Sequence, residues 1–369
     1  MSASTVSSSA QSVDLLHALC ALPTVPFGEQ RVMQWINRWA RTRRRLHSMR
    51  DGVGNTLIEL PAKGTSPRLV LVAHLDHPGF TAEEMTGPRT LRARFNGGVA
   101  AKYFIGSAVR FYVGDKEVRG RIESVEVDDA QRPLAATLRV PSAIPPGTIG
   151  MWDQGGPRVR GHRFSCRVCD DLAGVACALA VLENLYRLRL KASVAVLLTR
   201  GEEEGFIGAI AAAKSRKLLK ASDRIISIEC SAEQTYAKQG DGVILRAGDR
   251  TSIFNSAFSR FIHQRAQVLA KIDSSFKAQR ALMPGGTCEA TVFDAYNYRA
   301  AAVCVPMGNY HNMNAATGKI GPEYIDLRDW QSEVTLLTDV AREHHAFTGD
   351  HADLRQQLQK RYEKFEKLL

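Results

Sequence analysis

The pattern of apolar and polar positions divides the chain into three parts. Helices are expected within residues 12–46, interrupted at ALPTVPFGE, and the segments DGVGNTLIEL and RLVLVAH that follow have the composition of strands. From Thr81 to about Pro157, short alternating runs such as VRFYV and AATLRV are separated by Gly, Asp and Pro. This pattern is typical of a small β-barrel or sandwich.

After Asp170, helical periods and apolar strands alternate again. Expected strands are SVAVLLT, RIISIEC and AAVCVPM, and expected helices include residues 253–271, one long helix after about Pro322, and a charged C-terminal one. We therefore predict an α/β fold, with a mostly parallel mixed sheet flanked by helices and an inserted small β-barrel. The expected domains are residues 1–80 with 158–369, and the barrel at 81–157.

Several of these apolar strands end in ionisable groups. In chain order these groups are His74 and Asp76, then Glu202 and Glu203, then Glu229, and finally His311; Asp170 and Asp171 open the helix after the barrel. Open α/β sheets place their sites at the carboxyl ends of the strands. The side chains are therefore expected at one sheet edge.

Two histidines with several carboxylates form a mixed nitrogen and oxygen set, suited to Zn²⁺ or to Co²⁺ or Mn²⁺. One metal would leave some of them unpaired, whereas two, about 3.5–4 Å apart and sharing a carboxylate and a water, would use all of them. Taken singly, His74 could be a core histidine, Asp170 a helix N-cap, and residues 202–204 a first-turn acidic cluster. Their occurrence together favours a site.

The ordered motifs HLD, CDDLAG, TRGEEEG, IEC and NYH resemble the dinuclear-metal aminopeptidases. Within that clan the chain is most similar to the tetrahedral aminopeptidases, which include deblocking and glutamyl enzymes and some proteins named endoglucanases. FGEQRV, DGVGNT, IPPGTIG and GGTCEA extend the resemblance over most of the chain.

The resemblance implies a role for each residue. His74 and Glu229 would bind one metal, Glu203 and His311 would bind the other, and Asp170 would bridge the two. Glu202 would be the general base or acid, and Asp76 would orient His74; Asp171 would lie next to the bridge.

The chain also departs from the family pattern. His77 stands where an acid is usual, Leu172 replaces a common arginine, and Glu229 replaces the more usual Asp. Residues 307–309 lack the basic residue often found before the last histidine. We therefore expect altered substrate contacts, with His77 either a pocket group or a solvent-facing turn residue, and with the glycines of GGTCEA either beside a bound peptide or in a simple turn.

The net charge of +11 changes this picture little. Residues 31–50 contain seven arginines and no acid, which favours the solvated face of an amphipathic helix, with Val32, Trp35, Ile36 and Trp39 inward, over a nucleic-acid surface. The C-terminal stripe of Leu354, Leu358, Tyr362 and Phe365 favours a docking helix or oligomer contact over a membrane surface.

Other features concern location and redox state. No apolar run is long enough to span a bilayer, the N-terminus does not resemble a signal peptide, and the seven cysteines are an odd number in apolar segments. We expect a cytoplasmic protein with reduced thiols, and interpret Cys166 and Cys169 as strand or loop thiols.

The expected function is that of a metallo-aminopeptidase with two divalent ions per subunit, acting on short peptides. By resemblance, it would be a homo-oligomer, without nucleic acid or membrane as partner. Two alternatives remain: a metal-dependent amidohydrolase or deacylase acting on N-acyl amino acids, and a catalytically inactive binding protein with a basic surface.

Overall fold

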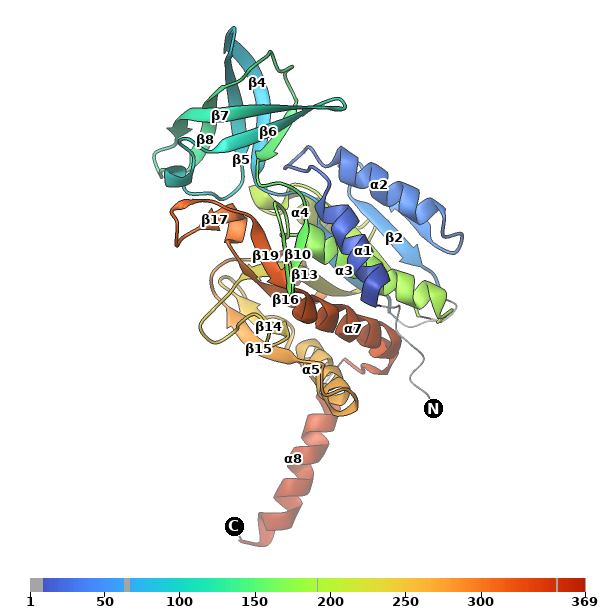
Figure 1. Cartoon of the computed structure of the whole chain (residues 1–369). Coiled ribbons are helices and arrows are strands. Elements are labelled where there is room, and N and C mark those ends of the chain that lie inside the picture. The colour runs from blue at the N-terminus through green and yellow to red at the C-terminus, as the bar shows by residue number, and fades with distance from the viewer. Residues whose placement is uncertain (1–8, 63–66, 191, 350, 369) are drawn as a thin grey trace.

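The centre of the molecule is an eleven-stranded mixed sheet (Figure 1). The computed structural model describes residues 9–62, 67–190, 192–349 and 351–368. The main path of the sheet runs, in spatial order, through β1 (His47–Arg50), β2 (Thr56–Leu60), β12 (Val194–Thr199), β3 (Leu69–His74), β13 (Arg224–Ala232), β16 (Arg299–Gly308), β19 (Glu323–Asp326), β11 (Arg163–Cys166) and β10 (Arg158–Arg160). β14 (Val243–Asp249) pairs with β16 and with β15 (Ala278–Met283). The central strands β12, β3, β13 and β16 are parallel, so their carboxyl ends share one edge.

Helices cover both faces of this sheet. Along β3, Leu69, Leu71 and Ala73 belong to one hydrophobic core and Val70 and Val72 to another, because successive side chains of a strand point to opposite faces. The first core is covered by α1 (Ser9–Cys20), α2 (Gln30–Arg41), α3 (Leu172–Arg187), α5 (Ser256–Ile272) and α7 (Leu327–Glu343), and the second by α4 (Ile207–Ser215) and α6 (Glu289–Ala295).

A closed antiparallel barrel lies at one end of the molecule (Figure 1). Its strands, in order around the barrel, are β4 (Gly79–Gly87), β5 (Thr90–Asn96), β8 (Pro133–Arg139), β7 (Lys116–Val127), β6 (Ala108–Val113) and β9 (Ile149–Trp152). Aromatic rings fill it, with Trp152 edge-on to Phe80 at a centroid distance of 4.8 Å. The predicted fold class is confirmed, whereas the division into domains at 81 and 157 stays a prediction.

Several local expectations are corrected. In the arginine-rich segment the helix α2 ends at Arg41, and His47–Arg50 form the edge strand β1. Trp35 and Trp39 are only partly buried against the core. Residues 202–204 form a 3₁₀ turn before α4 rather than its first turn, and β13 continues past Glu229 to Ala232.

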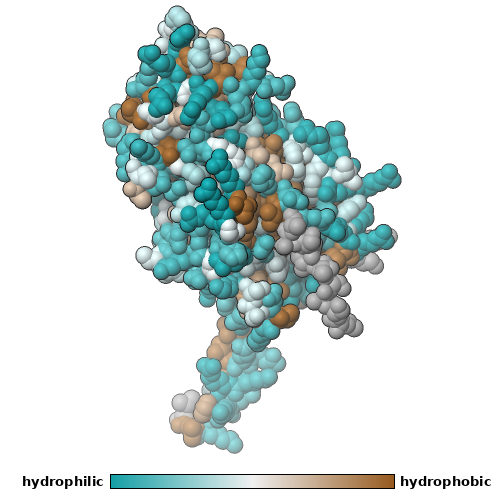
Figure 2. Space-filling view, viewed as in Figure 1, coloured by the Kyte–Doolittle hydropathy of each residue, from teal (hydrophilic) through white to brown (hydrophobic). Residues whose placement is uncertain are grey.

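Two smaller elements complete the described chain. β17 (Met313–Asn314) pairs with β18 (Lys319–Ile320) in a separate hairpin. The C-terminal helix α8 (Ala352–Phe365) extends away from the body, with Leu358, Tyr362 and Phe365 about half exposed (Figure 1). The face seen in Figure 2 is mostly hydrophilic, with hydrophobic residues in small separate groups, some of them on α8. Among the described residues, no helix combines the length and hydropathy that crossing a membrane requires.

Candidate metal centre and active site

The carboxyl edge of the parallel strands brings the six predicted metal-centre side chains together. His74 ends β3, Glu202 and Glu203 lie in the turn after β12, Glu229 lies on β13, and His311 follows β16. Asp170 comes from the segment just before α3. His74, Asp170, Glu229 and His311 are buried, and only 11% of the Glu202 side chain is exposed.

Asp170 stands between the two histidines. Its Oδ1 lies 3.3 Å from His74 Nε2, and its Oδ2 lies 3.6 Å from His311 Nε2. On one side, Glu229 Oε2 lies 3.8 Å from His74 Nε2; on the other, Glu203 Oε1 lies 3.2 Å from His311 Nε2. Donor atoms of His74, Glu202 and Glu229 all lie within 4.8 Å of one another, and so do those of Asp170, Glu203 and His311. The arrangement has the shape of two adjoining cation sites.

The chemistry of these donors fits divalent metal ions. Asp170 Oδ1, Glu203 Oε1 and Glu229 Oε1 are buried without a hydrogen-bond partner, which is costly for carboxylate oxygens. Burial, the largest cause, and the nearby charge of Asp170 raise the pKa of Glu229 to about 8. Like-charged buried carboxylates repel one another, and bound cations would relieve that repulsion.

Both histidines are held through one ring nitrogen. His74 Nδ1 lies 3.2 Å from the backbone oxygen of Asp76, and His311 Nδ1 lies 2.8 Å from the backbone oxygen of Gly98 in the barrel. A carbonyl partner at Nδ1 fixes the proton there and leaves Nε2 free as a ligand atom. In both rings this Nε2 faces the carboxylates.

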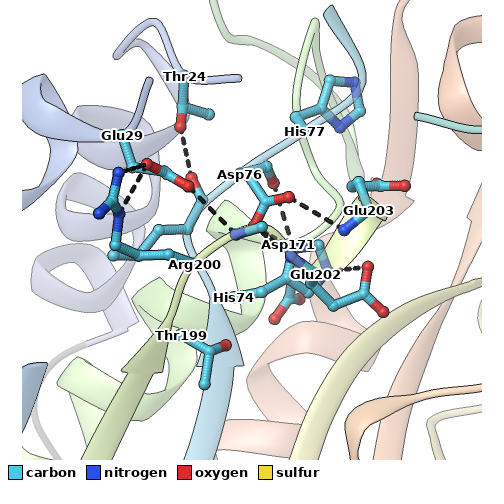
Figure 3. A network of polar contacts seen from close by, with 12 residues as sticks. Thr24, Glu29, His74, Asp76, His77, Asp171, Thr199, Arg200, Glu202 and Glu203 are labelled. Atoms are coloured by element: carbon cyan, nitrogen blue, oxygen red, sulfur yellow. Dashed lines mark hydrogen bonds and ion pairs between the residues drawn. The ribbon is translucent and has the colours of Figure 1, made fainter. Parts of the chain in front are cut away.

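The Asp76 carboxylate fixes the turn that carries the two glutamates. It accepts hydrogen bonds from the backbone N–H groups of Glu202 and Glu203, each at 3.0 Å (Figure 3). Its Oδ1 is 3.8 Å from His74 Nδ1, farther than the Asp76 backbone oxygen. Burial raises the pKa of Asp76 to about 7.

An ion pair between Glu29 and Arg200 anchors the same turn from the other side (Figure 3). The buried Glu29 carboxylate accepts from Arg200 Nε at 2.9 Å and from the Gly201 N–H at 3.2 Å. Gly201 has φ of +62°, a left-handed conformation that glycine adopts readily. The segment before α2 and the turn after β12 are thereby tied together.

Two predicted alternatives are wrong. His77 is buried rather than solvent-facing: its Nδ1 lies 2.6 Å from the Asp170 backbone oxygen, and its Nε2 lies 2.9 Å from Asn312 Oδ1. The N-cap of α3 is Asp171, whose side chain accepts from the Gly174 N–H at 3.2 Å, and not Asp170. The Asp170 side chain is thus left free to face the histidines.

The thiols and one further acid lie just behind this centre. Cys166 and Cys169 are buried, with their Sγ atoms 3.4 Å apart. Glu323, which sequence reasoning missed, accepts from the backbone N–H groups of Cys169 at 2.6 Å and Asp170 at 3.1 Å. Its only signal in the sequence is an acid at the start of a short strand after Pro322.

A pocket opens beside the centre, lined by five of the six residues: His74, Asp170, Glu202, Glu229 and His311. Gly285 and Gly286 of the GGTCEA segment contribute to its wall, as does Tyr310, whose ring stacks on His311 with centroids 3.8 Å apart. Arg246 also lines it and was not singled out from the sequence, although an arginine within the apolar run VILRA was a usable signal. A substrate in this pocket would contact Glu202 directly.

Comparison with known proteins agrees with this geometry. Residues 137–319 match the model of the M42 glutamyl aminopeptidases. Over this segment, just under half of the chain, the chain resembles that family. The predicted resemblance and the predicted class of enzyme, a metallo-aminopeptidase, are confirmed. No curated protein matches the chain.

Solved structures share the fold of this chain at low identity. The Pyrococcus horikoshii TET1 peptidase, solved as a dodecamer, is 21% identical with a TM-score of 0.74, over 90% of this chain and 99% of that one. An aminopeptidase of Desulfurococcus kamchatkensis is 20% identical with a TM-score of 0.75, over 93% and 99%. A Thermotoga maritima protein described as an endoglucanase is 16% identical with a TM-score of 0.66, over 89% and 97%.

Proposed function

We propose that the chain removes N-terminal residues from peptides at a dinuclear metal centre. The observation that carries this proposal is the position of Asp170, whose two oxygens each face a different histidine. His74 and Glu229 would hold one ion and Glu203 and His311 the other, with Asp170 bridging. Two divalent ions, zinc first and cobalt or manganese as alternatives, would polarise the scissile carbonyl and lower the pKa of a water.

Glu202 is the general base in this proposal. Its carboxylate lines the pocket, and Oε2 lies 3.9 Å from His74 Nε2, so it faces the same space as the donor atoms. Burial and the carboxylates of Glu203 and Glu229 raise its pKa well above the usual value. A carboxylate placed there can accept the proton of an attacking water and return it to the leaving amine.

Asp76 and Glu29 act on the position of Glu202 rather than on the substrate. Asp76 holds the N–H groups of the turn, and Glu29 holds Arg200 and Gly201 just before it. Assembly into a homo-oligomer is part of the proposal, supported by the dodecameric TET1 structure. A cytoplasmic location stays a prediction.

The test is elemental analysis of the purified protein, together with hydrolysis of an aminoacyl-anilide panel and of N-acetyl amino acids. We expect two metals per chain, turnover of anilides, and for Glu202→Gln retained metal with activity reduced about 10²- to 10⁴-fold. Glu84→Gln, an exposed glutamate on the barrel strand β4, is the control and should keep its activity.

Three results would contradict the proposal. Cleavage of N-acetyl amino acids without cleavage of anilides would identify an amidohydrolase. A protein that takes up no Zn²⁺, Co²⁺ or Mn²⁺ and turns over nothing would be a binding protein on this scaffold. Full activity of Glu202→Gln would remove Glu202 from the mechanism.

A further inference from the structure

A pocket on the barrel, which we call the arginine pocket, is lined by four arginines. Arg119 and Arg121 lie on β7, Arg139 ends β8, and Arg89 precedes β5; these three strands are neighbours in the barrel (Figure 1). All four side chains are exposed. The arginine pocket shares no lining residue with the pocket beside the metal centre, so it is a separate site.

The strand register holds these positive charges together. Residues 119 and 121 are two positions apart on β7, so both side chains point to the same side of the strand. Arg121 stands directly opposite Arg139 in the antiparallel pairing of β7 with β8. Arg89 is tied to the same place, because its backbone oxygen accepts the Val140 N–H at 2.9 Å. Like charges directly opposite one another destabilise a sheet, and a bound anion would relieve that repulsion.

Two of the four guanidinium groups have no carboxylate partner. Arg121 Nη1 donates to the backbone oxygen of Gly106 at 2.7 Å. Among the residues that the structure describes, no carboxylate oxygen lies within 4.0 Å of a side-chain nitrogen of Arg121 or Arg89. Elsewhere on the barrel, Arg92 is paired with two glutamates. The barrel therefore neutralises this arginine and leaves two at the pocket without a partner.

The other two arginines of the pocket have one carboxylate each. Arg139 Nε lies 2.7 Å from Glu123 Oε1, and Arg119 Nε lies 2.7 Å from Asp153 Oδ2. The other oxygen of Asp153 pairs with Arg110, so this carboxylate is shared. A guanidinium stays protonated in proteins, so two carboxylates against four such groups leave the pocket positively charged.

This arrangement suits an anion that carries several charges. The planar guanidinium forms paired hydrogen bonds with phosphate oxygens, and a chain of phosphate groups offers several negative charges within a short span. A second copy of this chain is disfavoured as the occupant, because each copy carries a net charge of +11. A small, separate anion is favoured instead.

We propose that the arginine pocket binds the phosphate chain of a small polyphosphate ligand. Such a chain has two sources, inorganic polyphosphate and a nucleoside triphosphate, and both present the same oxygens to the guanidinium groups. The inference goes beyond the proposed function and does not depend on it, because no residue of the arginine pocket belongs to the metal centre.

Equilibrium dialysis of the full, metal-loaded chain against inorganic triphosphate, ATP and citrate tests the site. At low salt, we expect triphosphate to bind about 10-fold more tightly than citrate, an anion of carboxylates, and to lose affinity as salt is added. The source follows from the comparison with ATP. Tighter binding of ATP identifies a nucleotide as the ligand, and equal or weaker binding identifies inorganic polyphosphate.

The decisive variants are Arg121→Gln and Arg89→Gln, which remove the two guanidinium groups without a carboxylate partner. Each should weaken triphosphate binding about 10-fold. An exposed arginine without a partner is not in itself unusual, and Arg94 on β5 is another. Because Arg94 does not line the pocket, Arg94→Gln removes the same charge from the same barrel and should keep the wild-type affinity.

Four results would overturn the inference. The first is the absence of triphosphate binding by the wild type at low salt. The second is wild-type affinity in Arg121→Gln or Arg89→Gln, which would place the anion elsewhere, for example on metal ions at the active site. The third is an equal loss in Arg94→Gln, which would indicate the diffuse charge of the barrel. The fourth is equally tight binding of citrate, which would exclude selectivity for phosphate.

Discussion

Backbone carbonyls set the orientation of both histidines at the centre. His74 meets the Asp76 carbonyl and His311 meets the Gly98 carbonyl, each through Nδ1, so both Nε2 atoms converge on Asp170. A carbonyl cannot lose this function by titration, unlike a carboxylate partner. The Asp76 carboxylate is thereby free to accept the backbone N–H groups of Glu202 and Glu203, in the turn at residues 202–204 that we call the glutamate turn.

Replacing Asp76 by Asn should impair catalysis on every substrate. The amide keeps one acceptor oxygen but places an NH₂ group against a backbone N–H of Glu202 or Glu203, which leaves a buried donor unsatisfied. The expected loss is about 10- to 100-fold in kcat/KM, corresponding to ~1–3 kcal/mol. Kinetics with Glu and Gln anilides, and metal titration, check it.

The control for Asp76→Asn is Asp128→Asn in the barrel, another carboxylate that accepts two backbone N–H groups, from Ala130 and Arg132. It should leave kcat/KM unchanged. Wild-type kinetics in Asp76→Asn would show that the turn holds its shape without these two bonds.

At the scale of elements, the sequence predicts which strands end in ionisable groups. It does not predict which side chains from distant parts of the chain contact those groups. The apolar runs before His74 and Glu229 stop at ionisable groups, and this local pattern suffices to place them at one edge. Positions such as Glu323 and His77 contact Asp170 through its backbone, across 153 and 93 residues of sequence, and no local pattern encodes that distance. Arg246 was missed because β14 and β15 do not show a regular alternation.

We predict that the stability of the fold depends on pH through His344, which lies where α7 meets β13. His344, in the turn after α7, is 2% exposed, and burial together with the charge of Arg224 lowers its pKa from 6.5 to about 4. Between these values the unfolded chain binds a proton that the folded chain excludes, so stability is lost as the pH falls from 6.5 to 4. The loss attributable to this group is up to ~3 kcal/mol.

Denaturant unfolding of the wild type and of His344→Asn from pH 8 to pH 4 isolates this effect. The difference in unfolding free energy between the two should be constant above pH 6.5 and should shift against the wild type below it. His47→Asn, which removes an exposed imidazole on β1, is the control for the loss of a histidine as such. A constant difference for His344→Asn would mean that the imidazole is protonated equally in both states.

At the scale of the whole molecule, the barrel takes part in building the site. Its loop after β5 provides the Gly98 carbonyl for His311, and the Gly97 N–H donates to Glu204 Oε1 at 2.8 Å. Glu204, the last residue of the turn at residues 202–204, and the last histidine are therefore held by a loop of the barrel, outside the main sheet. Changes in the barrel should reach the metal centre through this loop.

Gly97→Ala tests this coupling. Gly97 has φ of +115°, and an added Cβ would lie 2.7 Å from Pro78 Cβ, so the loop must shift and carry the Gly98 carbonyl away from His311. We expect metal content to fall from two toward one per chain, with kcat reduced and the barrel still folded. The control is Gly147→Ala. Gly147 also has a positive φ, but an added Cβ there would meet nothing within 4 Å, so the variant introduces backbone strain without a steric clash. It should keep both metals. Two metals and full activity in Gly97→Ala would show that His311 is oriented without the barrel, and the role of the barrel would then lie outside the active site.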